Sequence, residues 1–341
     1  MCIFCIFLWL GQLPYVLRGP VVASWAVLDG KLLCPFGENA SGMERRVLVP
    51  YDGSNPAEAA LDYALKAFPD SDLLILHVVE PFPDHGKAAG HPNRRSEQVF
   101  EESEQLLEAA ESRVSEQGRA VETQLRYGRP VHAILRAVEE QGIEEVVMGS
   151  HGRDGAARLL LGSVAETVVR RAPVPVTVVP PDEDGPHRDN EFGSPDEVLV
   201  PFDGSTCARR ALEYALRSFP DASVTALYVI YPSVEEYEVI ETEADLEAAI
   251  EEDEARRSPG DRESEHVLAI AKRTAGQRGR DVELASRAGD PERVLLEWIE
   301  EHGPDHVVMG CHGRDGLARI LLGSVAETVV RRAPVPVTTV K

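Results

Sequence analysis

The sequence predicts an α/β protein in which two similar Rossmann-like domains follow one another. Three observations support this. Short apolar runs alternate with amphipathic stretches in both halves, as in βαβ units with a parallel sheet. The predicted strands are rich in Val, Ile and Leu on both faces, which is typical of a sheet covered by helices on each side. The second half of the chain also repeats the first, so we expect a tandem duplication.

The repeat is strongest in one segment of each half. That segment is identical at 28 of 32 positions between the copies, whereas the 27 residues before it share only 11 identities. The compared ranges are 148–179 with 309–340, and 121–147 with 282–308. Recent duplication or gene conversion would explain the near identity, but it would not leave the neighbouring segment so different. A shared constraint on the repeated segment is the better explanation.

The same order of elements is expected in both halves. Predicted helices of the first half lie at 56–68, 96–117, 131–141 and 164–171. Predicted strands lie at 46–51, 73–79, 121–127, 145–149 and 174–179, and again at 198–202, 224–230, 282–287, 306–310 and 335–340. Ser54 is the expected N-cap of the first helix, and Gly118 and Gly142 are expected helix stops. Ten extra residues of the second copy fall in an acidic helical segment at 241–277, broken at Ser258-Pro-Gly.

Four segments are expected along the chain. Residues 1–42 have no counterpart in the second half and form a non-homologous extension, interpreted as a mis-assigned start because Met43 leads directly into the first strand. Their initial apolar stretch is shorter than the ~20 residues that span a bilayer, so a membrane anchor is the weaker alternative. Domain 1 is expected at 43–180 and domain 2 at 196–341, joined by an acidic, proline-rich linker at 181–195.

The composition is strongly acidic, with 58 Asp and Glu against 35 Lys and Arg, and a net charge of −23. Only five residues are lysine. Such a surface repels nucleic acid and anionic membranes, because binding either requires Lys or Arg to neutralise phosphates. It suits a cytosol rich in salt, where charge repulsion is screened within ~3 Å at 1 M. We therefore expect a halophilic, cytoplasmic protein with no nucleic-acid partner and no membrane partner.

The five cysteines indicate a reducing compartment and no metal site. Three lie within residues 1–42, and the other two, Cys207 and Cys311, are far apart in the sequence without metal-ligand spacing. Cys311 replaces Ser150 of the first half, so a small residue is all that this position is expected to need.

The most informative motif is a glycine-rich loop between an apolar strand and a helix. Both copies read G-x2-G-x9-G-S, from Gly149 to Ser163 and from Gly310 to Ser324. Glycines let the backbone approach a ligand closely, and a helix N-terminus favours an anion through its N–H groups and dipole. The two loops therefore predict two bound nucleotides.

Asp52 and Asp203 add a second element at the same crevice. Each follows the first strand of its half, whereas the glycine loop follows the fourth strand. In a doubly wound sheet, ligands bind beyond the carboxyl ends of the strands where the strand order reverses. The alternative is that Asp52 only forms the Asp-Gly-Ser turn and caps the first helix, and the two roles can coexist.

Other loop residues also have structural alternatives. Ser163, with Glu166 three residues later, has the pattern of a capping box and could merely cap the helix. Arg153 and its repeat Arg314 could approach phosphates or be surface charges. His151 and the equivalent histidine of the second half fit hydrogen-bonded loop residues better than ligand contacts.

Several catalytic signatures are absent from the sequence. It has no G-x-x-x-x-G-K-[ST] loop, no G-x-G-x-x-G after the first strand, no G-x-S-x-G elbow and no HExxH. No evident general base or nucleophile accompanies the expected phosphates. The sequence indicates binding more clearly than catalysis, and no catalytic residue and no metal ligand is predicted.

These residues resemble the universal stress protein (UspA) family, in its ATP-binding branch. The resemblance rests on Val-Pro-Tyr-Asp52-Gly-Ser, on Met148-Gly-Ser-His-Gly152 and on Gly162-Ser163-Val164. It rests equally on the second copies of these motifs, and it covers essentially both predicted domains.

The resemblance implies five-stranded parallel sheets of order 3-2-1-4-5 with an adenine nucleotide in each half. The base is expected near Asp52 and Val78 and the phosphates on the loop, with ATP as ligand, with or without Mg²⁺. It also implies that the halves pair through their last strands as an intramolecular pseudo-dimer, and a further homo-oligomer is left open. The expected nucleotide-binding residues are Pro50, Asp52, Val78, Met148, Gly149, Gly152, Arg153, Gly162, Ser163 and Val164, and in the second half Pro201, Asp203, Val229, Met309, Gly310, Gly313, Arg314, Gly323, Ser324 and Val325.

The expected function is a nucleotide-dependent stress-response or regulatory module that hydrolyses ATP weakly at most. One alternative is a slow ATPase or phosphotransferase that uses the same sites. Another is a structural scaffold whose loops are occupied only incidentally.

Overall fold

The computed structural model describes residues 27–28, 31–32, 45–80, 94–152, 161–181, 194–230, 259–311 and 322–341. The chain forms two compact units, Met1–Met43 and Glu44–Lys341. Within its described residues the first unit contains an antiparallel pair of short strands, β1 (Val27–Leu28) and β2 (Lys31–Leu32). The sequence pattern does not predict this pair, since two residues are too few to show an alternation.

In the second unit, strands and helices alternate as predicted. The elements of the first half are β3 (Arg46–Pro50), α1 (Asn55–Ala67), β4 (Asp72–Val79), α2 (Arg94–Glu116), β5 (Val121–Tyr127), α3 (Pro130–Glu140), β6 (Glu145–Gly149), α4 (Ser163–Arg171) and β7 (Val176–Val179). Ser54 is the N-cap of α1, as predicted. Gly118 and Gly142 follow α2 and α3 with φ of 76° and 64°, a left-handed backbone that ends a helix and favours glycine.

The second half repeats this order. Its elements are β8 (Glu197–Pro201), α5 (Thr206–Ser218), β9 (Ser223–Ile230), α7 (Pro259–Gly276), β10 (Glu283–Ala288), α8 (Pro291–His302), β11 (His306–Gly310), α9 (Ser324–Arg332) and β12 (Val337–Val340). The long acidic segment is described only from Pro259 onward, and residues 241–258 lie outside the described residues. The described part of this segment begins at the predicted Ser258-Pro-Gly break.

The ten strands that the structure describes in this unit belong to one sheet of order β10-β9-β8-β11-β12-β7-β6-β3-β4-β5. Within each half the strands are parallel and follow the order 3-2-1-4-5. The last strands of the two halves, β7 and β12, pair antiparallel, with Thr177 opposite Thr338. The predicted α/β fold class is therefore confirmed, and the two five-stranded sheets are parts of one continuous sheet.

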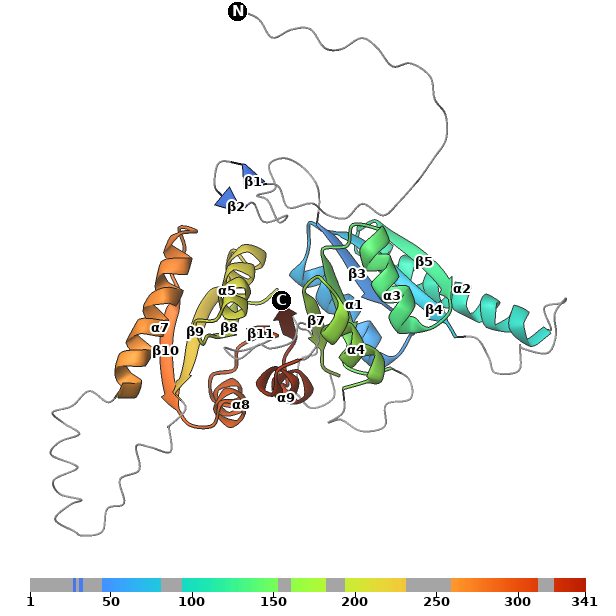
Figure 1. Ribbon diagram of the computed structural model, residues 1–341. Helices are drawn as coiled ribbons and strands as arrows, with labels where there is room; N and C mark the ends of the chain where they lie inside the picture. Colours follow the sequence, from blue (N-terminus) through green and yellow to red (C-terminus); the bar gives the residue numbers. More distant parts are fainter. Residues whose placement is uncertain are drawn as a thin grey trace, which may run out of the picture. The chain divides into compact units, whose positions relative to one another are not determined.

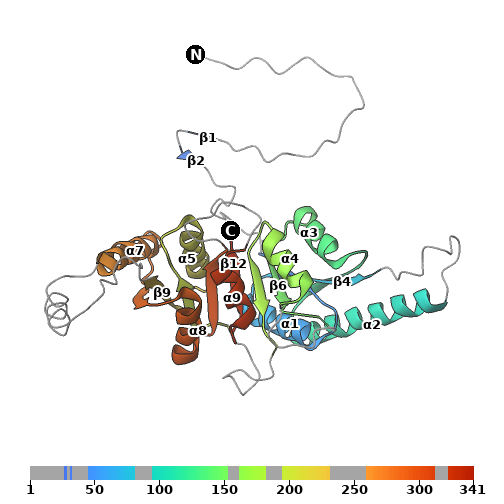
Figure 2. The same ribbon diagram turned by 60° about the horizontal axis from the view of Figure 1, so that its bottom comes forward.

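Helices cover both faces of the sheet (Figures 1 and 2). One hydrophobic core contains residues of α1, α2, α5 and α7, and the other contains residues of α3, α4, α8 and α9. Successive side chains of a strand point to opposite faces, so Val47 and Val49 lie in the first core whereas Leu48 lies in the second. Each core includes residues of both halves.

The halves also meet through a buried polar cluster, which we call the central cluster. It consists of Arg45, Tyr63, Glu145, Thr177, Tyr214, His306 and Thr338. Its carboxylate is Glu145, which has no exposed surface. Glu145 pairs with the Arg45 guanidinium, and it accepts hydrogen bonds from the Tyr214 hydroxyl at 2.7 Å and the Thr177 hydroxyl at 2.8 Å.

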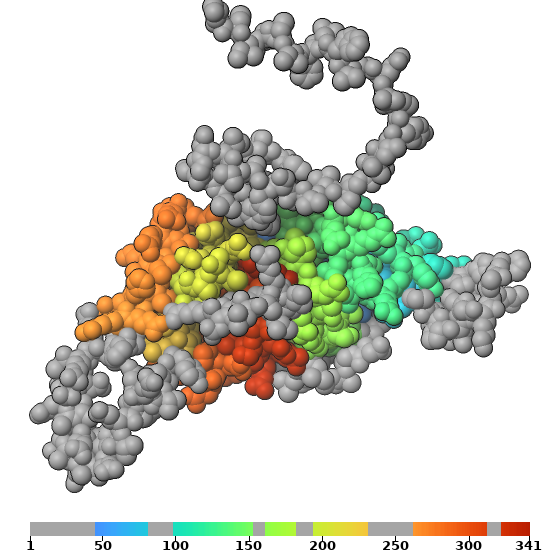
Figure 3. Space-filling model, viewed as in Figure 1, coloured from blue at the N-terminus to red at the C-terminus, as the bar shows by residue number. Residues whose placement is uncertain are grey.

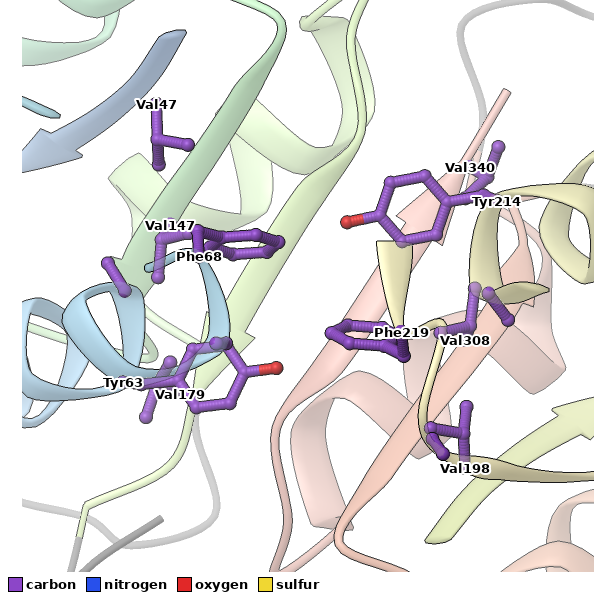
Figure 4. Packing of buried hydrophobic residues seen from close by; sticks show 14 of the residues in the cluster. Val47, Tyr63, Phe68, Val147, Val179, Val198, Tyr214, Phe219, Val308 and Val340 are labelled. Atoms are coloured by element: carbon purple, nitrogen blue, oxygen red, sulfur yellow. The ribbon is translucent and has the colours of Figure 1, made fainter. Parts of the chain in front are cut away.

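His306 occupies the equivalent position of the second half and is also fully buried. Its Nδ1 lies 2.7 Å from the Tyr63 hydroxyl, and its Nε2 lies 2.8 Å from the Thr338 hydroxyl. In Figure 4 the hydroxyls of Tyr63 and Tyr214 point toward the opposite half. Each half thus contributes one tyrosine to a polar residue of the other.

Burial sets the charges in the central cluster. It raises the pKa of Glu145, and it lowers the pKa of His306 to about 3, because a low-dielectric interior disfavours the charged form of each group. Burial also raises the pKa of Tyr63 and Tyr214, so both remain hydroxyl groups. The cluster therefore holds a neutral His306 imidazole at neutral pH, and Arg45 offsets part of the cost of burying the Glu145 carboxylate.

Contacts outside the sheet also join the halves. The Lys341 ammonium donates to the carbonyl oxygens of Arg170 and Ala172 at 2.9 and 2.5 Å, at the C-terminus of α4, where the helix dipole favours a cation. Arg331 of α9 lies 3.8 Å from Glu166 of α4. In Figure 3 the red segment that contains α9 adjoins the light-green segment that contains α4.

Candidate functional site

The carboxyl ends of two neighbouring strands bring the predicted residues together in each half. In the first half β3 ends at Pro50, with Asp52 two residues later, and its neighbour β6 ends at Gly149. Pro201, Asp203 and Gly310 have the same positions at the ends of β8 and β11. The first and fourth strands of each half are adjacent, as the strand order requires. This edge is therefore where a doubly wound sheet binds a ligand.

Asp52 lies against the glycine loop. A Cβ added to Gly152 would lie 2.7 Å from Oδ2 of Asp52, so even an alanine side chain would displace the carboxylate. The other carboxylate oxygen, Oδ1, accepts hydrogen bonds from the backbone N–H of Ser54 at 3.0 Å and from its hydroxyl at 2.6 Å. Asp203 makes the equivalent backbone contact with Ser205 at 2.9 Å. The turn-forming role of Asp52 is confirmed, and its second oxygen faces the loop.

The glycine loop is closed at its base. The N–H of Gly162 donates to the carbonyl oxygen of Ser150 at 2.7 Å, and in the second half Gly323 donates to Cys311 at 2.9 Å. A Cβ on Gly162 would lie 3.1 Å from Cα of His151, so any side chain here would push His151 away by a few tenths of an ångström. Nδ1 of His151 lies 3.0 Å from the Ser150 hydroxyl, which fits the hydrogen-bonded loop residue expected from the sequence.

The helix that follows the loop begins without a side-chain cap. The N-cap of α4 is Gly162, whose extended backbone (φ −63°, ψ 148°) presents its carbonyl oxygen to the N–H of Glu166 at 2.8 Å. Ser163 is already helical and exposed, so the capping-box interpretation of Ser163 is wrong. The helix α9 begins in the same way at Gly323. By contrast, Ser54 caps α1 with its hydroxyl.

A glycine N-cap leaves the first turn of α4 without a side-chain acceptor, while the helix dipole places partial positive charge there. An anionic ligand can supply the acceptor. The acidic residue of this turn, Glu166, is paired with Arg170 at 2.6 Å, and Glu327 of α9 is paired with Arg331 at 2.8 Å. These pairs offset the negative charge next to both helix starts.

The packing of the fold itself requires glycine at positions 149 and 310. A Cβ on Gly149 would lie 2.6 Å from the carbonyl carbon of Pro56, and one on Gly310 would lie 2.9 Å from that of Cys207. The first turns of α1 and α5 therefore pack directly on the strand ends. This packing requires glycine whether or not a nucleotide binds.

The remaining predicted residues lie around this edge. Met148 and Met309 are buried in the second core. Val78 in β4, Val229 in β9, and Val164 and Val325 in the first turns of α4 and α9 are partly exposed. The residues Arg153, Gly313 and Arg314 lie outside the described residues.

No group of three or more His, Cys, Asp and Glu among the described residues could hold a metal ion. No helix of the described ranges is long and apolar enough to cross a membrane.

The sequence analysis missed a contact between two cysteines at this edge of the second half. Cys207 lies in the first turn of α5 and Cys311 directly follows β11, and a Cβ placed on Gly310, the residue before Cys311, would lie 2.7 Å from Cβ of Cys207. They are far apart in the sequence but adjacent in the fold. The sequence does contain a sign of this contact: Pro56 and Ser150 of the first half are both replaced by cysteine in the second half.

Comparison with known proteins gives a consistent result across the chain. The profile of the universal stress protein family matches residues 43–180 and 195–341. The chain is 31% identical over 305 residues to a universal stress protein of Mycobacterium tuberculosis, which covers 85% of this chain and 95% of the relative. It is 32% identical over 145 residues to one of Methanocaldococcus jannaschii, covering 41% of this chain and 85% of the relative. The crystal structure of a universal stress protein from Archaeoglobus fulgidus superposes with a TM-score of 0.62 at 25% identity, covering 87% of this chain and 98% of that chain.

Proposed function

Because the chain belongs to the universal stress protein family, we propose that each half binds one adenine nucleotide and that the protein is a nucleotide-dependent module of the stress response. The ligand is ATP, with or without Mg²⁺. The binding domains are 43–180 and 196–341, joined by the linker at 181–195. One observation carries the proposal: in both halves a closed glycine loop leads into a helix whose N-cap is glycine and has no side-chain cap.

The phosphates of the nucleotide are assigned to the helix start. In the first half the backbone N–H groups after Gly162 and the exposed Ser163 hydroxyl would donate to phosphate oxygens. Gly152 would let the loop approach the ligand, and Arg153 would add positive charge. Gly313, Gly323, Ser324 and Arg314 have these roles in the second half.

The adenosine is assigned to the ends of the first two strands. Asp52 is fixed by Ser54 through one oxygen, which orients the carboxylate for a hydroxyl or amine donor of the ligand. Pro50 and Val78, both partly exposed, offer apolar surface to the base. Pro201, Asp203 and Val229 are the second-half equivalents.

We also propose that the two halves work as an intramolecular pseudo-dimer. The antiparallel pairing of β7 with β12 supports this, as do the two tyrosine contacts that cross between the halves. A salt-rich cytosol is the setting proposed for the chain, supported by its net charge of −23.

The proposal is tested by titrating the purified chain with ATP and counting the sites by calorimetry. We expect about two ATP per chain, since each loop precedes one helix N-terminus. Gly152→Val should remove the first-half site, because Asp52 fills the space of the new side chain. Gly313→Val should remove the other site, and the double variant should bind no ATP. Gly276→Ala is the control, because nothing lies within 4 Å of the added Cβ.

Two other results would contradict the proposal. If both single variants keep two sites, the loops do not hold the nucleotide, and the incidental-scaffold alternative gains support. If the chain turns ATP over at about 1 s⁻¹, the low end for enzymes, and Asp52→Ala and Asp203→Ala abolish turnover but keep binding, the chain is an ATPase or phosphotransferase.

A further inference from the structure

The second half carries a pair of thiols that the first half lacks. Cys207 is the second residue of α5, and Cys311 is the first residue after β11, within the glycine loop. A Cβ placed on Gly310, next to Cys311, would lie only 2.7 Å from Cβ of Cys207. The Cys207 thiol is also close enough to Cys311 to contribute to the raised pKa of the Cys311 thiol. Neither cysteine is in a disulfide in this structure.

The two thiols differ in exposure. Cys311 is 1% exposed, whereas Cys207 is partly exposed at the start of its helix. A small oxidant from solvent therefore reaches Cys207 first, while the buried Cys311 is positioned to react with the product. Solvent access and a neighbouring cysteine that can resolve a sulfenic acid are two features of redox-sensitive thiols.

We propose that Cys207 and Cys311 form a reversible disulfide that weakens nucleotide binding in the second half and leaves the first half unchanged. The disulfide itself is independent of ligand, whereas its effect on nucleotide rests on the proposed function.

The oxidant is a peroxide, and the chemistry has two steps. The Cys207 sulfur attacks one oxygen of hydrogen peroxide, the O–O bond breaks, and a sulfenic acid and one water form. The Cys311 sulfur then attacks the sulfur of that sulfenic acid. The S–O bond breaks, the S–S bond forms, and the hydroxide that leaves takes the thiol proton of Cys311 as a second water. Two thiols are oxidised and one peroxide is reduced, and a dithiol such as dithiothreitol reverses the change.

The proton needed in the second step is available. Burial raises the pKa of the Cys311 thiol to about 11, so this group still carries its proton at neutral pH. Because the thiolate is the attacking form, Cys311 gives up this proton as its sulfur attacks, and the leaving hydroxide takes it to form water.

The link to the nucleotide site runs through the backbone of Cys311. Its carbonyl oxygen accepts the hydrogen bond from Gly323, the N-cap of α9, and its N–H donates to Val340, both at 2.9 Å. An S–S bond is about 2.05 Å long, much shorter than any non-bonded contact between two sulfurs. Forming it pulls Cys311 toward α5 and strains the hydrogen bond that positions Gly323. A misplacement of ~1 Å is enough to impair a site of fixed geometry.

The experiment uses the full chain, treated with hydrogen peroxide or with dithiothreitol and then cleared of reagent. One part is alkylated and digested with trypsin without reduction. The expected product is the tryptic peptide 189–209 linked to the tryptic peptide 294–314, each of which contains a single cysteine. The other part is titrated with ATP by calorimetry. We expect one site of unchanged affinity and one weakened about tenfold, which dithiothreitol restores.

Cys311→Ser is the matched control, because the first half already has serine at this position. In this variant peroxide should give no 189–209 to 294–314 peptide and no change in either site. Absence of the linked peptide from the oxidised parent chain would overturn the disulfide. A linked peptide with two unchanged ATP sites would overturn the coupling. If the reduced chain binds no ATP at all, the proposed function fails, and the peptide map still decides the disulfide.

Discussion

The fourth strand of the first half begins with Glu145, and the equivalent strand of the second half begins with His306. Both side chains are fully buried, and each forms a hydrogen bond with a tyrosine from the opposite half. They differ in charge, whereas the glycine loops that end the same two strands are almost identical. We attribute the likeness of the loops to the one kind of ligand that both are proposed to bind. The central positions only have to fit each other.

The charge difference follows from the neighbouring residue. Arg45 compensates Glu145, but the equivalent of Arg45 in the second half is Asp196. A second carboxylate at position 306 would have no such arginine, and an uncompensated buried charge is strongly unfavourable. A neutral histidine, with one partner on each ring nitrogen, meets the same packing and hydrogen-bonding need. The two halves therefore use different residues to meet the same packing and hydrogen-bonding requirement.

Arg45→Met is expected to cause the largest loss of unfolding free energy. It leaves the buried Glu145 carboxylate without its cation, and removing one partner of a buried pair costs about 3–5 kcal/mol of unfolding free energy. Arg46→Met is the control, because the Arg46–Glu122 pair is exposed and such pairs contribute about 1 kcal/mol or less. Chemical unfolding at neutral pH measures both. Equal losses from the two variants would show that burial does not govern the central cluster.

The next effect is a pH dependence of opposite sign at the two equivalent positions. The pKa of His306 is lowered in the folded state to about 3, so its contribution to stability is complete above pH 6.5 and is lost as the pH falls toward 3. At about 1.4 kcal/mol per pH unit, this group should cost roughly 3 kcal/mol between pH 6.5 and 4.5. His306→Gln should therefore flatten the rise of unfolding free energy with pH in this range. His302→Gln is the control for losing an exposed histidine.

Glu145 acts in the other direction. Its pKa is raised in the folded state, so its contribution is complete below pH 4.5 and is lost as the pH rises through the folded pKa. Glu145→Gln should therefore steepen the rise of unfolding free energy with pH above 4.5, the reverse of His306→Gln. Slopes that change in the same direction in both variants would contradict the assignment of charges in the central cluster.

The smallest loss of unfolding free energy is expected from substitutions at the strand ends, where the two halves can again be compared. Gly149→Ala and Gly310→Ala each force the first turn of a helix away from its strand, at a cost of about 1–3 kcal/mol. We expect the larger loss for Gly149, since its Cβ would meet the Pro56 backbone at 2.6 Å, against 2.9 Å for Gly310 and Cys207. Thermal or chemical unfolding decides this. A loss no greater than that of Gly276→Ala would show that the helices do not pack as described.

The elements of the fold were predictable because their signals are local. Alternation of apolar residues, the Ser54 cap and the stop at Gly118 depend on near neighbours in the chain. The meeting of Asp52 with the glycine loop was also predictable, because the strand order of a doubly wound sheet places the two strand ends side by side.

What the sequence did not reveal depends on contacts between distant segments. Arg119 donates to the carbonyl oxygens of Leu65, Phe68 and Ser71 at the end of α1, and Arg280 repeats this clamp in the second half. An arginine in the loop before a strand carries no local sign of such a role. The capping-box alternative for Ser163 fails because the helix begins one residue earlier, with Gly162 as N-cap, and the sequence motif does not reveal that shift.

The measurement that tests the central claim most directly is to identify what the purified chain already holds. The full chain is prepared in multimolar salt without added nucleotide, denatured with acid, and the released ligand is identified by chromatography and mass spectrometry. Two equivalent loops predict about two adenine nucleotides per chain. An empty chain that also fails to bind added ATP would contradict the account and leave only the fold.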